Sequence, residues 1–192
     1  MRRMGRVTFR AAGTFGAIAV AIFIAATAGT SAANADRERG WTERVGKGSF
    51  ADRLLAAHND ERRRVGVPDL RWSPKLAAEA QAHAKKLSKQ NALVHASRME
   101  RGGAGENLWA GRAGFYSAEE MIEGMVNEKR HFKRGQFPQV SKTGQWRDVG
   151  HYTQLIWRET TDVGCAVVPG GGNDWLVCRY WPAGNIYGKP VL

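Results

Sequence analysis

The feature that most limits the fold of this chain is a pair of apolar runs near its C-terminus, each carrying one of its two cysteines. A proline- and glycine-rich segment joins the two runs, and this pattern predicts a β-hairpin. A turn at Gly171 and Gly172 places Cys165 directly opposite Cys178, where paired Cβ atoms lie close to disulfide distance. Because no Cys-x-x-Cys motif is present, we predict a structural disulfide rather than a redox pair.

Both faces of the predicted hairpin are largely apolar. One face carries Val163, Cys165, Val167, Leu176, Cys178 and Tyr180. The other face carries Gly164, Ala166, Val168, Trp175, Val177 and Arg179. A sheet that is apolar on both sides has to be covered on both sides, so helices are expected above and below it.

Three stretches have the apolar spacing of amphipathic helices, and a serine suited to an N-cap precedes each: Ser49, Ser73 and Ser117. Gly66 predicts the end of the first helix, and Pro74 fits the first turn of the second. The third helix is expected to reach about residue 132. Three helices around one small sheet predict an α+β fold, a three-layer α-β-α sandwich with a small antiparallel sheet between helices.

The first 35 residues have the composition of an export signal. Four arginines precede an uncharged stretch, residues 11–33, and Ala33-Asn34-Ala35 fits a cleavage site. A stretch of this length could also span a membrane, but its many small residues favour cleavage near Ala35. We therefore expect a signal peptide at 1–35, a linker at 36–48 and one domain at 49–192. The mature protein would be secreted, to the periplasm or the extracellular medium, and would not be transmembrane.

The chain is basic, with a net charge of +11, of which +7 remains without the four arginines of the signal. A basic exported protein is attracted to anionic polymers and membrane surfaces, although the charge also serves solubility. No nucleic-acid-binding motif is present, so nucleic acid is not an expected partner. The run Arg62-Arg63-Arg64 is expected to lie on a solvated helix face.

One acidic residue stands out because it lies on an apolar stripe. Glu128 shares the helical spacing of Met121, Met125 and Phe132, where an unpaired carboxylate would be costly. It therefore needs a partner, and histidines or a metal ion are the simplest. His58 and His83, by contrast, lie on apolar helix faces and are expected to be core residues.

Two C-terminal motifs carry a resemblance to a known family. They are Gly150-His151-Tyr152-Thr153-Gln154-Leu155-Ile156-Trp157 and Cys178-Arg179-Tyr180-Trp181-Pro182-Ala183-Gly184-Asn185. They resemble the paired signatures of the CAP superfamily (cysteine-rich secretory proteins, antigen 5 and pathogenesis-related proteins), and the likeness runs from about Leu54 to Ile186. The resemblance implies the sandwich fold and a cleft lined by two histidines and two glutamates. Matched motif by motif, these four residues are His95, Glu106, Glu128 and His151.

Three kinds of chemistry fit these four residues. His95 and His151 as neutral imidazoles suit a divalent cation such as Zn²⁺, with the glutamates as further ligands or as partners of the histidines. An acid/base site is a second possibility, with Glu106 or Glu128 as the catalytic candidate. The third is a hydrogen-bonded cluster that only satisfies buried polar groups.

The functional expectation is binding rather than turnover. The resemblance implies a lipid or sterol as one class of ligand, and the basic charge implies an anionic envelope polymer as another. The predicted loop 133–149, with Phe137, Val140 and Trp146 among basic residues, is a candidate contact for an amphipathic ligand. The alternative is a metal-assisted hydrolase, in which His95 and His151 hold the ion and a glutamate activates water.

Overall fold

The computed structural model describes residues 48–192. The predicted signal peptide and all but the last residue of the predicted linker lie outside the described residues. Within 48–192, no helix combines the length and the apolar character needed to cross a membrane.

The described chain alternates helices with the strands of one sheet. The helices are α2 (Phe50–Val65), α3 (Pro74–Gln90), α4 (Ala118–Val126) and α5 (Gly150–Leu155), with the 3₁₀ turns η1 (Asn127–His131) and η2 (Trp146–Val149). The strands are β1 (Arg71–Trp72), β2 (Gly105–Arg112), β3 (Asp162–Gly170) and β4 (Asn173–Trp181), in the order β1-β3-β4-β2. The β2–β4 and β3–β4 pairs are antiparallel, whereas the two-residue strand β1 is parallel to β3.

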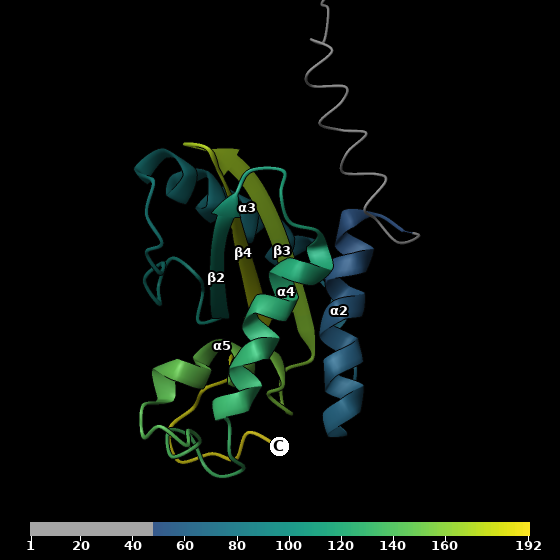
Figure 1. Ribbon diagram of the computed structural model, residues 1–192, viewed down its shortest axis with the longest axis vertical. Coiled ribbons are helices and arrows are strands. Elements are labelled where there is room, and N and C mark those ends of the chain that lie inside the picture. The colour runs from purple at the N-terminus through teal and green to yellow at the C-terminus, as the bar shows by residue number, and fades with distance from the viewer. Residues whose placement is uncertain (1–47) are drawn as a thin grey trace, which may run out of the picture.

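The helices form a layer on each face of this sheet (Figure 1). Helix α3 covers one face with a small cluster that contains Ala80, Ala84 and Leu87, packed on Trp175 and Val177. Helices α2, α4 and α5 cover the other face with the main core. The predicted three-layer α-β-α sandwich is therefore confirmed, and the short parallel β1–β3 pair is the one departure from a purely antiparallel sheet.

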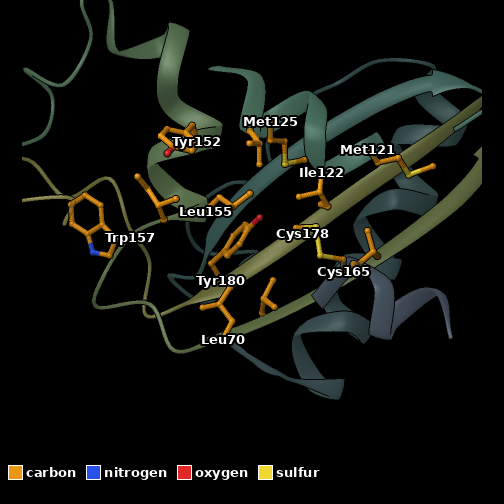
Figure 2. Close-up of a cluster of buried hydrophobic side chains, with 14 of the residues drawn as sticks. Leu70, Met121, Ile122, Met125, Tyr152, Leu155, Trp157, Cys165, Cys178 and Tyr180 are labelled. Carbon is orange, nitrogen blue, oxygen red and sulfur yellow. A yellow bond between two sulfur atoms is a disulfide. The ribbon is translucent and has the colours of Figure 1, made fainter. Parts of the chain in front are cut away.

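The predicted hairpin has the predicted register. Cys165 pairs with Cys178 across β3 and β4, and their sulfur atoms form a disulfide. Figure 2 shows this disulfide and Tyr180 beneath apolar side chains from the helical layer. The two sets of hairpin residues divide between the two cores as the alternation predicted, because successive side chains of a strand point to opposite faces.

The helix starts also follow the sequence, since Ser49, Ser73 and Ser117 each accept a hydrogen bond from the first turn of a helix. Helix α4 is shorter than predicted, however. It ends at Val126 and tightens into η1, whose residues are polar and include none that is buried. Glu128 therefore lies on a 3₁₀ turn beyond the apolar stripe of α4.

The prediction of a solvated face at Arg62-Arg63-Arg64 is wrong for Arg62. Its side chain is fully buried, and its guanidinium donates hydrogen bonds to four backbone carbonyls, those of Pro68, Leu155, Trp157 and Thr160. Arg62 follows His58 by four residues and Leu54 by eight, so it continues the buried stripe of α2. Its guanidinium fixes the chain that leaves α5.

Candidate functional site

The first histidine–glutamate pair joins the loop after α3 to the start of β2. His95 Nδ1 lies 2.7 Å from Glu106 Oε1, and the backbone N–H of Ala96 donates to the same oxygen at 3.0 Å. The carboxylate is buried, whereas the His95 side chain is 58% exposed. Gly105, the residue before Glu106, allows Gln154 to pack against the start of β2, because a Cβ at position 105 would lie 2.1 Å from Oε1 of Gln154.

Two further titratable side chains, Arg179 and His83, lie near the other oxygen of Glu106. Arg179, directly opposite on β4, places Nη2 3.0 Å from Glu106 Oε2, and His83 Nε2 lies 3.7 Å from the same oxygen. Burial would raise the pKa of Glu106, but the hydrogen bond from His95 and the charge of Arg179 outweigh it and lower that pKa below its ordinary value. Glu106 is therefore a carboxylate held in its ionised form.

The second pair has the same construction at the start of α5. His151 Nδ1 lies 2.6 Å from Glu128 Oε1. The other oxygen, Oε2, accepts hydrogen bonds from the backbone N–H groups of His151 and Tyr152, at 3.0 and 3.1 Å. Glu128 thus binds the first turn of α5, and it fixes the ring and the backbone of His151 together.

The two pairs meet at one cavity of about 610 Å³, to which His95, Glu106 and His151 all contribute. In each pair a carboxylate accepts from Nδ1, so Nδ1 carries a proton, and Nε2 is the ring nitrogen that the carboxylate leaves free. Both imidazoles are partly exposed, His151 at 37%. In each pair the histidine is the more exposed partner, and the glutamate fixes the orientation of its ring.

The comparison with known families agrees with this architecture. The sequence model of the cysteine-rich secretory protein family, CAP, matches residues 55–180. The chain belongs to the CAP family. It is 39% identical over 136 residues to pathogenesis-related protein 1C of Nicotiana tabacum, covering 70% of this chain and 76% of that protein. It is 32% identical over 139 residues to the human Golgi-associated plant pathogenesis-related protein 1, covering 71% and 85%.

Solved structures show the same CAP fold. The crystal structure of NaASP2 with Zn²⁺ superposes with a TM-score of 0.64 at 24% identity, covering 75% of this chain and 85% of that one. Venom allergen-like protein 4 of Schistosoma mansoni superposes with a TM-score of 0.54 at 19% identity, covering 71% and 90%. At these identities the likeness concerns the fold.

The second of the two CAP motifs holds the first in place. Asn185, whose φ is +56°, donates to the carbonyl of Gly150 at the start of α5 and accepts from Thr153. Gln154 accepts from the backbone N–H of Gly184 at 2.9 Å. Each motif therefore satisfies polar groups of the other, and together they set the position of His151.

The aromatic residues near the site differ in whether they line the cavity. Tyr152 is buried and donates to Glu61 at 3.0 Å, and neither Tyr152 nor Trp109 lines the cavity. In segment 133–149, Val140 is a core residue, and Phe137 is buried but also lines the cavity. Trp146 does line the cavity. Segment 133–149 thus packs into the core at some residues and lines the cavity at others, and its contact with an amphipathic ligand stays a prediction.

Sequence reasoning missed the role of Arg179. The signal was present, because Arg179 is the one charged residue on a hairpin face that is otherwise apolar or glycine. A charge at such a position requires a buried partner, and Glu106 is that partner. His83 was expected in the core, and its Nε2 donates to the Val94 carbonyl, 2.9 Å away, yet it also approaches Glu106.

A second group of potential metal ligands lies in the core. One ligand atom each of His58, Cys165 and Cys178 falls within 4.8 Å of the others. The two sulfur atoms are joined in a disulfide, and a metal ligand requires a thiolate. Both nitrogens of His58 are also engaged, with the Leu54 carbonyl and the Tyr180 hydroxyl. With the disulfide formed, this group does not fit a metal.

Proposed function

We propose that the cleft binds a divalent cation such as Zn²⁺ through Nε2 of His95 and Nε2 of His151. The observation that carries the proposal is the pairing of each Nδ1 with a carboxylate, at 2.7 and 2.6 Å. Metal-binding histidines in proteins have this arrangement, since the carboxylate fixes the tautomer and raises the basicity of the ligating nitrogen. A bound ion would supply a positive charge and open coordination positions for a ligand.

The same geometry favours binding over hydrolysis. In the hydrolase hypothesis, Glu106 or Glu128 activates a water molecule. Each glutamate, however, already accepts an imidazole N–H and at least one backbone N–H, and Glu106 also faces Arg179. A carboxylate whose charge is compensated in this way is a poor general base. We therefore propose an exported binding protein, a role consistent with the disulfide and with the name of a relative, secreted protein RBT4 of Candida albicans, which is 34% identical over 143 residues.

Calorimetric titration with zinc chloride tests the cation site. The wild-type protein is expected to bind zinc saturably, and a His95→Ala/His151→Ala variant is expected to lose that binding. His131→Ala is the matched control, because His131 does not line the cavity and its ring nitrogen accepts only from Arg130. Zinc binding that survives in the double variant, or that is lost in the control, would contradict the proposal.

The glutamates should influence the cation only through the histidines. Glu106→Gln or Glu128→Gln keeps an oxygen acceptor but removes its charge, and each is expected to weaken zinc binding about 10- to 100-fold. Glu100→Gln serves as the control, because Glu100 is exposed and contacts Lys86 and Ser97 rather than a histidine. Equal zinc affinity in Glu106→Gln, Glu128→Gln and the wild type would show that the glutamates do not tune the histidines.

A further inference from the structure

The cleft has a strong excess of positive charge that the cation site does not use. Three arginines line the cavity with the two histidines: Arg98, Arg101 and Arg147. Among its described lining residues, the only carboxylate is Glu106, and Arg179 already faces that group at 3.0 Å. The field inside the cleft is therefore positive even before any metal binds.

The three arginines also lack the carboxylate partners that half of the other described arginines have. Arg53, Arg63, Arg64, Arg71 and Arg179 form ion pairs with carboxylates. Within the described part of the chain, Arg98, Arg101 and Arg147 form none. Nε of Arg101 is buried without any hydrogen-bond partner, and the cost of such a donor disappears if a ligand accepts from Nε.

Aromatic rings line the same cavity beside these guanidinium groups. Trp146 packs edge-on against Phe137, which packs in the same way against Tyr187, with centroids 5.2 and 5.4 Å apart. Tyr187 is nevertheless 68% exposed. The guanidinium of Arg147 lies 5.0 Å from the Trp146 ring, a stacked position that leaves its N–H edge free for an anion. The cavity thus has a rigid ring surface next to unpaired donors.

We infer that this cleft is a binding site for an acidic saccharide, whose carboxylate or sulfate groups are held by Arg98, Arg101 and Arg147. Guanidinium groups bind such oxyanions through charged, often paired hydrogen bonds. The apolar C–H face of a sugar ring packs on exposed aromatic rings such as Tyr187, and 610 Å³ is within the range of small-ligand sites. The inference goes beyond the cation site, because the arginines act with or without a metal.

The test is calorimetry with trigalacturonate, a carboxylated trisaccharide, and with the neutral maltotriose, both in EDTA. Trigalacturonate is expected to bind saturably, more weakly as salt is raised, and maltotriose at least about tenfold more weakly. Arg98→Gln/Arg147→Gln is expected to weaken trigalacturonate binding about tenfold or more. Arg112→Gln/Arg134→Gln is the matched control, since it removes the same charge outside the cavity and is expected to leave binding unchanged.

Several results would overturn the inference. Equal weakening in the two arginine double variants would show that net charge alone attracts the ligand. Equal affinity for maltotriose, or equally tight binding of inorganic phosphate, would remove the acidic saccharide as the ligand. Capture of phosphatidylglycerol vesicles without trigalacturonate binding would assign the arginines to a membrane surface.

The saccharide site and the cation site can fail separately. Arg98→Gln/Arg147→Gln is expected to retain zinc binding, and His95→Ala/His151→Ala is expected to retain trigalacturonate binding in EDTA. A wild-type protein that binds trigalacturonate but not zinc would contradict the cation proposal alone, and a wild-type protein that binds zinc but not trigalacturonate would contradict the saccharide inference alone.

Discussion

Replacement of Arg62 by methionine is expected to lower the free energy of unfolding by about 4 kcal/mol. The substitution keeps much of the apolar volume but removes donors to four backbone carbonyls at 2.7–3.0 Å. Buried carbonyls without a donor are costly, and those of Leu155 and Thr160 would be left in that state, whereas the Trp157 carbonyl still accepts from the Thr160 N–H. Urea unfolding followed by tryptophan fluorescence measures the change.

The neighbouring arginine provides the control. Arg63 is 57% exposed and pairs with Asp60 and Asp69 on the surface, so Arg63→Met is expected to cost only about 0.5 kcal/mol. A loss below about 1 kcal/mol in Arg62→Met would show that water or a rearranged chain satisfies the four carbonyls.

The second large effect is a loss of stability in acid that depends on His58. Burial lowers the pKa of His58 from 6.5 to about 4, the largest cause being desolvation. Above pH 6.5 the residue is neutral in both states and has no effect. Between pH 6.5 and 4 the unfolded state binds a proton that the folded state does not. The free energy of unfolding therefore decreases by about 3 kcal/mol in total as the pH is lowered from 6.5 to 4. Below pH 4 this contribution is constant.

A neutral amide isolates this contribution from the other titrating groups. In the folded protein, His58 accepts from the hydroxyl of Tyr180 and donates to the carbonyl of Leu54, so a proton added to the ring places a charge in the core. His58→Gln cannot take up that proton. Urea unfolding at pH 7, 5.5 and 4 should show a shallower loss in the variant, whereas parallel curves would mean that His58 is not the titrating group.

The sandwich could be predicted because its signals are local. Serine caps define where helices begin, and alternation within the hairpin fixes its register and both of its faces. The disulfide followed from that register, since Cys165 and Cys178 are symmetric about the turn. The need of Glu128 for a partner was predicted from an apolar stripe, and the structure pairs it with His151 although it lies on a 3₁₀ turn beyond that stripe.

The parts that sequence reasoning missed depend on contacts between distant segments. Arg62 and Arg179 have side chains that are usually solvated, and only carbonyls or a carboxylate from other elements make their burial favourable. The 3₁₀ turn after α4 likewise depends on a distant contact, because its residue Glu128 accepts a hydrogen bond from the first turn of α5. The short strand β1 pairs over only two residues, too few to leave a periodic pattern.

The role of the two imidazoles is tested most directly by anomalous diffraction at the zinc edge from crystals grown with zinc. The expected result is a single peak in the cleft, about 2.0–2.1 Å from Nε2 of both His95 and His151, with Glu106 and Glu128 still at Nδ1. A peak bound by a glutamate oxygen, or no peak in the cleft of a zinc-saturated crystal, would contradict the account.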